Sequence, residues 1–307
     1  MMTSLSTVCF LTATLLAQNE TATGPGLTPV RSIITVESRH DHDKHVPTLS
    51  RADVMAHERD NRLQVTGLDT KPGLELYFLI DDASGISLGS QLADLRLFID
   101  AQPANVSIGI GYMRNGTVQI LQELTTNHAA SSKALRLPFS GAGAMPSPFL
   151  SVSDLIKRWP ASPNRREVVL IASGLDPLGG LGPANPYLDA AIQDAQRAGI
   201  LIFAIYTPPA GHGRHAFFGL TWAQSHLAQI AEETGGEAYM LGFGAPVSFA
   251  PYLADIGERL AHQYTVTFLM KAEHKGSLRA VRFNTELPNA EIVAPARVHV
   301  PPESAPR

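Results

Sequence analysis

The sequence predicts an α/β protein with a doubly wound, mostly parallel sheet and helices on both faces. Strands without polar alternation recur at about 74–80, 167–172 and 200–206, which is typical of parallel strands buried on both faces. Between them lie segments in which apolar residues follow helical spacing, such as 88–98. This alternation of strand and helix is the main evidence for the fold class.

One antiparallel strand is expected at an edge of this sheet. Asn115 and Gly116 are the residue pair most typical of a type I′ turn, and they join strand-like segments at 106–112 and 117–121. We therefore expect the second segment to fold back on the first as a hairpin.

Capping residues and glycines place the remaining helices. Asn127 and Ser151 are expected to cap helices at their N-terminal ends, and Gly199 is expected to follow the end of another. The helices are predicted at about 128–136, 151–159, 186–198, 222–234 and 249–262, with a short strand at 237–241.

The pattern divides the 307 residues into four parts. They are a possible signal peptide and linker at 1–30, an N-terminal β-rich segment at 31–72, the α/β domain at 73–263, and a C-terminal β annex with a tail at 264–307. In the N-terminal β-rich segment, Ser50 precedes Asp53 with the spacing of a capping box.

Composition and charge limit the classes of function. Hydrophobic residues make up 44% of the chain and charged residues 17%, which is enough apolar material for a packed core. The net charge is -4 and no basic stripe is visible, so we expect no nucleic-acid partner.

The N-terminal residues predict export. The apolar run at 8–17 is too short to span a bilayer and no Lys or Arg precedes it, so we interpret it as a weak or truncated secretory signal. A frayed N-terminus or a misplaced start codon is the alternative. The single cysteine, Cys9, lies in this run, so an exported mature chain would be cysteine-free, which suits a bacterial periplasm, cell envelope or secreted space.

Oxygen-bearing side chains gather where the first buried strand ends. Asp81, Asp82, Ser84 and Ser87 follow the apolar residues of this strand. In an open α/β sheet, ligands bind at the carboxyl ends of the strands. Carboxylate and hydroxyl oxygens are the ligands that a hard divalent cation such as Mg²⁺ prefers.

The order of several segments resembles the von Willebrand factor type A (VWA) domain, in the form found in bacterial VWFA-related proteins. The resemblance covers about residues 72–270. It depends on the segments 78–85 (Phe-Leu-Ile-Asp-Asp-Ala-Ser-Gly), 168–174 (Val-Val-Leu-Ile-Ala-Ser-Gly), 231–236 (Ala-Glu-Glu-Thr-Gly-Gly) and 263–268, and on the hairpin after Tyr112. It implies a VWA or Rossmann-like sheet and a metal-ion-dependent adhesion site, in which Asp-x-Ser-x-Ser on one loop, Thr on a second and Asp on a third hold a cation. That chemistry is binding and not catalysis.

The first loop matches this pattern in part. By the resemblance, Asp82 and Ser84 take the first two positions, whereas Ile86 takes the third, where Ser87 could substitute with a shift of one residue. If no metal binds, Asp82 and Ser84 are expected to form a turn and a helix cap before Leu88.

The other two loops also depart from the family pattern. Ser147 and Ser151 are the hydroxyl residues nearest to the position of the Thr, Ser173 stands where the family has Asp, and Asp176 lies three residues on. Losing a carboxylate and a hydroxyl weakens a cation site, so we expect a degenerate site at which Mg²⁺ or Mn²⁺ binds weakly or not at all. Its candidate metal ligands are Asp82, Ser84, Ser87, Ser173 and Asp176.

Loops at the same edge are candidates for contacts with a protein partner. His212 and His215 follow the end of a strand and, with Phe217 and Ser147, could line the ligand face. A surface loop without a binding role is the alternative for the histidines.

We expect no enzymatic activity, because a nucleophile elbow and the glycine-rich phosphate-binding motifs are absent. The predicted function is an adhesion-like, protein-binding VWA module outside the cytoplasm, with a metal dependence that is weak or lost. The alternatives are a structural VWA scaffold in a larger assembly and, third, a hydrolase that uses Asp82 and Asp176 with a metal.

Overall fold

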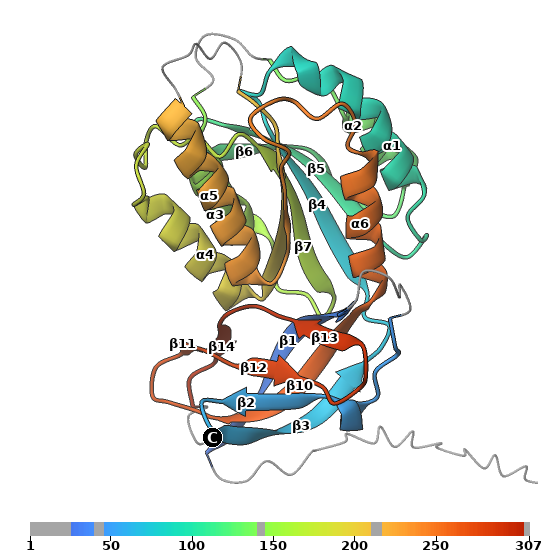
Figure 1. Ribbon diagram of the computed structural model, residues 1–307, viewed down its shortest axis with the longest axis vertical. Helices are drawn as coiled ribbons and strands as arrows, with labels where there is room; N and C mark the ends of the chain where they lie inside the picture. The colour runs from blue at the N-terminus through green and yellow to red at the C-terminus, as the bar shows by residue number, and fades with distance from the viewer. Residues whose placement is uncertain (1–25, 40–45, 140–144, 210–216, 304–307) are drawn as a thin grey trace, which may run out of the picture.

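The computed structural model describes residues 26–39, 46–139, 145–209 and 217–303, which form two units arranged along the long axis of the molecule, each with a six-stranded sheet (Figure 1). We call the part with helices the α/β unit and the other part the β unit. The N-terminal strands and the C-terminal strands both belong to the β unit, so the α/β unit is inserted between them.

Six strands form the sheet of the α/β unit, in the order β6-β5-β4-β7-β8-β9. They are β4 (Leu74–Asp81), β5 (Ser107–Arg114), β6 (Thr117–Thr125), β7 (Arg165–Ala172), β8 (Ile200–Tyr206) and β9 (Ala238–Tyr239). Only the pairing of β5 with β6 is antiparallel; the other neighbouring strands are parallel. The arrangement confirms the predicted fold class.

Helices cover both faces of this sheet (Figure 1). On one face lie α1 (Leu92–Asp100), α2 (His128–Ala134) and α6 (Ala250–Ala261), and on the other α3 (Pro148–Arg158), α4 (Pro186–Ala198) and α5 (Phe217–Thr234). Successive residues of a strand point to opposite faces, so β4 supplies both cores. Phe78 and Ile80 pack with α1 and α6, whereas Tyr77 and Leu79 pack with the helices of the other face.

The turn and cap predictions are confirmed at three places. Asn115 and Gly116 have φ angles of 53° and 77°, the left-handed values that the hairpin turn requires. Gly199 follows α4 with a φ of 65°, and the Asn127 side chain accepts a hydrogen bond from the amide of Ala130 at the start of α2.

The prediction for the start of α3 is wrong. The helix begins at Pro148, and Ser151 lies inside it, where its hydroxyl donates to the carbonyl oxygen of Ser147 (2.9 Å). Proline is well suited to the first turn of a helix because the amide it lacks would have no intrahelical partner there.

The β unit unites the two β-rich segments that the sequence places at opposite ends of the chain. Its main sheet has the order β12-β2-β3-β10-β1-β13, and β11 pairs with β14 beside it. The strands are β1 (Leu27–Ser38), β2 (Met55–Glu58), β3 (Asn61–Asp69), β10 (Gln263–Lys271), β11 (Ser277–Arg279), β12 (Arg282–Asn284), β13 (Ala290–Val293) and β14 (Val298–Val300). A short 3-10 helix, η1 (Arg51–Asp53), precedes β2 and has the predicted capping box at Ser50.

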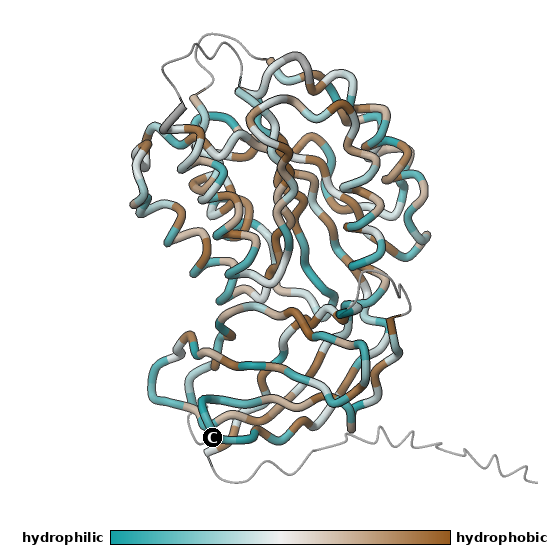
Figure 2. Tube along the Cα trace, in the orientation of Figure 1, coloured by the Kyte–Doolittle hydropathy of each residue, from teal (hydrophilic) through white to brown (hydrophobic). Residues whose placement is uncertain are grey.

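A buried polar network lies between the two units. The guanidinium of Arg165, at the start of β7, donates to the carbonyl oxygen of Leu260 (3.1 Å) and to the side chain of Gln263, at the start of β10. Glu167 lies 3.5 Å from the same guanidinium and accepts a hydrogen bond from Gln263 (3.3 Å). In Figure 2, hydrophobic residues gather along the central strands of the α/β unit.

Candidate functional site

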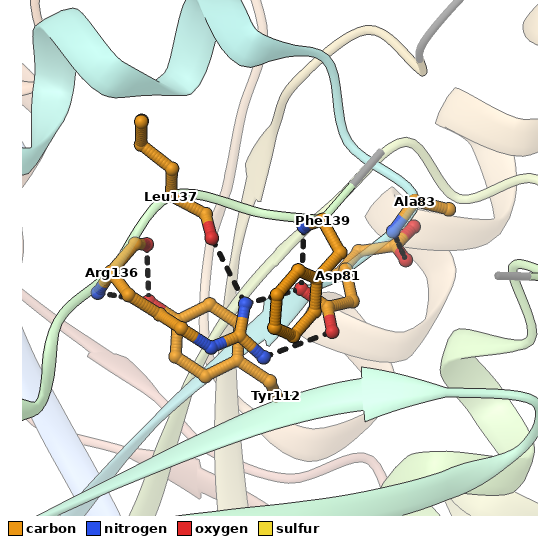
Figure 3. Close-up of polar contacts among 7 residues, drawn as sticks. Asp81, Ala83, Tyr112, Arg136, Leu137 and Phe139 are labelled. Atoms are coloured by element: carbon orange, nitrogen blue, oxygen red, sulfur yellow. Dashed lines mark hydrogen bonds and ion pairs between the residues drawn. The ribbon is translucent and has the colours of Figure 1, made fainter. Parts of the chain in front are cut away.

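The carboxyl end of β4 carries an ion pair that the sequence does not predict. Arg136, in the loop after α2, donates from both of its terminal nitrogens to Asp82, with distances of 2.7 Å to Oδ1 and 2.9 Å to Oδ2 (Figure 3). The Asp82 side chain is 1% exposed. The amide of Phe139 donates to the same carboxylate (3.1 Å), so Asp82 is fully engaged by donors of its own chain.

Two aromatic rings hold the guanidinium of Arg136 in place. Its Cζ lies 3.9 Å from the centre of the Tyr112 ring and 4.1 Å from that of Phe139 (Figure 3). The Tyr112 hydroxyl donates to the carbonyl oxygen of Arg136 (2.6 Å) and accepts from its amide (2.8 Å). Arg136 also donates to the carbonyl oxygen of Leu137 (2.9 Å). A bidentate pair stacked in this way is rigid and rules out a free cationic side chain.

Asp81, the last residue of β4, is a second buried carboxyl. Its Oδ1 accepts a hydrogen bond from the amide of Ala83 (2.9 Å), while Oδ2 has no partner among the described residues. Burial raises the pKa of this carboxyl to about 7; the Ala83 amide opposes that shift and the neighbouring Asp82 adds to it.

Asp176 lies in a separate cluster after the end of β7. Its Oδ1 accepts from the Ser147 hydroxyl (3.0 Å) and the Gly179 amide (3.2 Å), and its Oδ2 accepts from the Asn185 side chain (3.3 Å). Ser147, predicted as a partner contact, is 2% exposed and directly precedes α3. Its hydroxyl is therefore used inside the chain and offers no surface to a partner.

Of the remaining predicted metal ligands, Ser173 and Ser84 are buried, whereas the side chain of Ser87 is not described. Ser173 is buried, and its hydroxyl oxygen accepts from the amide of Leu175 (3.3 Å). Ser84 is buried, and its amide donates to the carbonyl oxygen of Asp81 (3.1 Å). Ser87 lies in the 3-10 helix η2 (Ile86–Gln91), and its side chain is not among those described.

The prediction that Asp82 or Ser84 caps the helix before Leu88 is wrong. Gly85 flanks η2 at its N-terminal end and no side chain caps it, so neither Asp82 nor Ser84 has the predicted capping role. Instead, the residues after Asp81 form a turn closed by the Ser84 amide.

Two of the predicted partner residues, His212 and His215, lie outside the described residues. Phe217 is the first residue of α5, which extends five residues before the predicted start at 222, and its side chain is not described.

Two of the predicted metal ligands, Asp82 and Asp176, are already engaged by groups of the chain itself. A guanidinium already neutralises Asp82, and three donors of the chain satisfy Asp176. Among the described residues, no group of three or more His, Cys, Asp or Glu side chains is placed to hold a metal ion. In the same part of the chain, no helix is long and apolar enough to cross a membrane.

Several large apolar side chains are exposed to solvent at this edge. They come from the loop between α2 and α3, the loop after β7, the first turns of α5 and the loop after β9. The exposed residues are Leu137, Phe139, Met145, Leu178, Leu181, Trp222, Leu241, Phe243 and Val247. Leu137 is 52% exposed, Phe139 61% and Val247 96%. Large exposed apolar patches mark interaction sites in many proteins.

Sequence reasoning missed Arg136, which controls the chemistry of this edge. Its partner Asp82 is 54 residues away in the chain, and no local spacing connects them. The one available signal is a basic residue at the end of a predicted helix and two residues before a proline, which indicates the start of a loop but not the partner of the arginine.

Comparisons with known proteins show only distant similarity. No protein-family model matches the chain, and no curated protein matches it. Among solved structures, an aerotolerance-related membrane protein from Bacteroides fragilis is 14% identical, over 61% of this chain and 98% of that protein, with a TM-score of 0.47. Proximal thread matrix protein 1 from the mussel byssus is 12% identical over 64% of this chain and 48% of its own length, with a TM-score of 0.43.

A VWA protein is also among the similar structures. VWA2, the ArnB paralog of Sulfolobus acidocaldarius, is 8% identical over 89% of this chain and 76% of its own, with a TM-score of 0.40. Identities and TM-scores this low say nothing about a ligand or a partner of the present chain.

Proposed function

We propose that this chain is a non-enzymatic, protein-binding module of the VWA type that acts outside the cytoplasm and binds its partner without a metal. The observation that carries the proposal is the set of exposed apolar side chains at the carboxyl edge of the sheet, which includes Leu137, Phe139 and Val247. Interface cores in other proteins are rich in aromatic and apolar side chains and poor in charge.

The Asp82–Arg136 pair supports independence from metal. The guanidinium supplies the positive charge that the Asp82 carboxylate would otherwise take from a cation, and two hydrogen bonds fix it there. Arg136 also donates to the carbonyl oxygen of Leu137, and the Phe139 amide donates to Asp82. The pair therefore fixes the loop that carries the exposed side chains of Leu137 and Phe139. A partner then contacts the surface that the pair supports, and not the pair itself.

The binding test needs a partner, which cross-linking to the full-length chain and mass spectrometry would identify. Binding of the purified partner is then compared for the wild type, for Phe139→Ser with Val247→Ser, and for a control, Leu97→Ser. Leu97 is 71% exposed but lies on α1, away from the loops of the edge. Leu97→Ser therefore makes the same kind of apolar-to-polar change outside the proposed binding face.

We expect the edge variant to weaken binding at least about tenfold, since a central apolar contact contributes about 2 kcal/mol or more. The control variant and added chelator should leave the affinity unchanged. Equal affinity of the edge variant and the wild type would reject the binding face and favour the structural scaffold.

Calorimetric titration of the full-length chain with Mg²⁺ and Mn²⁺ tests the metal part of the proposal. We expect no saturable heat up to millimolar metal. Saturable binding that Asp82→Ala abolishes would overturn metal independence and restore a metal-bridged ligand.

A further inference from the structure

A pocket at the opposite edge of the α/β sheet concentrates positive charge. It has a volume of about 220 Å³ and lies where the amino ends of β7 and β8 and the end of α4 meet β1, β10 and the segment 295–299. Its charged and titratable lining residues are Arg31, Arg165, Arg166, Arg197, Arg297 and His299. Among the described residues that line it, none is an aspartate or a glutamate.

Three of these arginines make no salt bridge in the described parts of the chain. Arg165 pairs with Glu167 and Arg197 with Asp194 (3.9 Å), whereas Arg31, Arg166 and Arg297 make no salt bridge there.

Backbone carbonyl groups position two of the arginines that make no salt bridge there. Arg31 donates to the carbonyl oxygen of Pro163 (2.7 Å), and Arg166 donates to that of Pro160 (3.2 Å). A carbonyl oxygen orients a guanidinium but carries no full negative charge to neutralise it. Burial lowers the pKa of Arg166 even though the charge of Glu75 raises it, so water solvates this guanidinium poorly.

Buried polar atoms without partners also belong to residues that line this pocket. They are Nε of Arg165, Oγ1 of Thr265 and Oε1 of Gln196, in side chains of residues that are 8%, 5% and 3% exposed. A buried polar group without a hydrogen bond costs about 1–3 kcal/mol, so a ligand that bonded these atoms would recover that free energy. Two of them are donors, and the amide oxygen of Gln196 is an acceptor.

We propose that this pocket binds a small anion that carries a phosphate or carboxylate group together with a hydroxyl. The anionic group takes hydrogen bonds from the arginines and Thr265, and the hydroxyl donates to Gln196. The volume of about 220 Å³ suits a hydroxylated small molecule of this kind. The site is independent of the apolar edge, since it lies at the other end of the strands.

Calorimetric titration of the full-length chain tests this site with glucose 6-phosphate, gluconate and glucose. The first two probes separate phosphate from carboxylate as the anionic group, and glucose supplies hydroxyls without charge. The variants are Arg297→Gln, Thr265→Val and, as a control, Arg62→Gln. Arg297 and Arg62 are both exposed, and neither makes a salt bridge in the described chain, so folding should survive their loss.

We expect saturable binding of at least one anionic probe and none of glucose. Arg297→Gln should weaken that binding about tenfold, which corresponds to about 1.4 kcal/mol. The control should bind like the wild type. Absence of saturable binding for both anionic probes, or an equal loss in Arg62→Gln, would overturn the proposal.

Discussion

The two edges of the α/β sheet differ in how the charges of their arginines are neutralised. At the carboxyl edge, the charge of Arg136 is matched by Asp82 and covered by the rings of Tyr112 and Phe139. At the amino edge, Arg31 and Arg166 are held by carbonyl oxygens and have no salt-bridge partner among the described residues.

The difference separates two kinds of binding surface. An edge whose charges are satisfied internally presents mainly its apolar side chains, and it suits a protein partner with a complementary apolar face. An edge with arginines that lack salt bridges and with buried atoms that lack hydrogen bonds suits a ligand that supplies a negative charge and hydrogen-bonding groups. Position at the carboxyl edge alone therefore does not identify the chemistry of a site.

Removing Arg136 should cause the largest loss of stability. In Arg136→Leu the Asp82 carboxylate remains buried without its counter-ion, so we expect the free energy of unfolding to fall by about 4 kcal/mol. Urea unfolding of the wild type and the variant measures this change. In Asp82→Asn with Arg136→Leu, part of the loss should be recovered, because no buried charge remains.

An exposed ion pair near the amino edge gives a matched control for this prediction. The Arg197–Asp194 pair is long, at 3.9 Å, and Arg197 is 53% exposed, so Arg197→Gln should change stability by less than about 0.5 kcal/mol. Similar losses in Arg136→Leu and Arg197→Gln would show that the buried pair is no more important than the exposed one.

The buried network at the amino edge should make stability depend on pH. Burial raises the pKa of the Glu167 carboxyl from its ordinary 4.5 to about 7, although Arg165 and Gln263 oppose that shift. Between these values the folded state holds a proton that the unfolded state has lost. The contribution of Glu167 to the free energy of unfolding should therefore fall as the pH rises through this window, by about 3 kcal/mol.

Glu167→Gln removes the titrating group and tests this sign. The variant should match the wild type near the lower end of the window and be more stable than the wild type above it. Urea unfolding at a series of pH values measures both curves. Parallel curves for the two proteins would mean that Glu167 ionises in the folded state as readily as in the unfolded chain.

The sequence predicts the α/β unit well because its signals are local. The apolar strand at 74–80 is observed as β4 from Leu74 to Asp81, and the hairpin turn at Asn115 follows from the φ preference of that residue pair. The β unit is less predictable, because β1 and β10 pair across more than 200 residues of chain. No local pattern shows that these two distant segments form one sheet.

The candidate site is predicted only as far as its acidic residues. Asp82 and Asp176 do lie beyond the carboxyl ends of neighbouring strands, as their positions after apolar runs indicate. Their partners Arg136 and Asn185 depend on how loops pack against each other, and the exposed apolar side chains depend on what those loops leave uncovered. The arginine pocket is also a product of tertiary structure, because it draws on both ends of the chain.

The hydroxyl of Thr265 in the pocket gives a smaller predicted effect than the two buried carboxyl groups do. This oxygen is buried without a hydrogen-bond partner among the described residues, so Thr265→Val should raise the free energy of unfolding by about 1 kcal/mol. Thr267→Val, at a partly exposed position of the same strand, should have a smaller effect because water can bond its hydroxyl. The substitution at Thr265 should at the same time weaken binding of the anion. A loss of stability in Thr265→Val would mean that the hydroxyl already has a partner in the folded chain, and the amino edge would then be as fully satisfied at this position as the carboxyl edge is at Asp82.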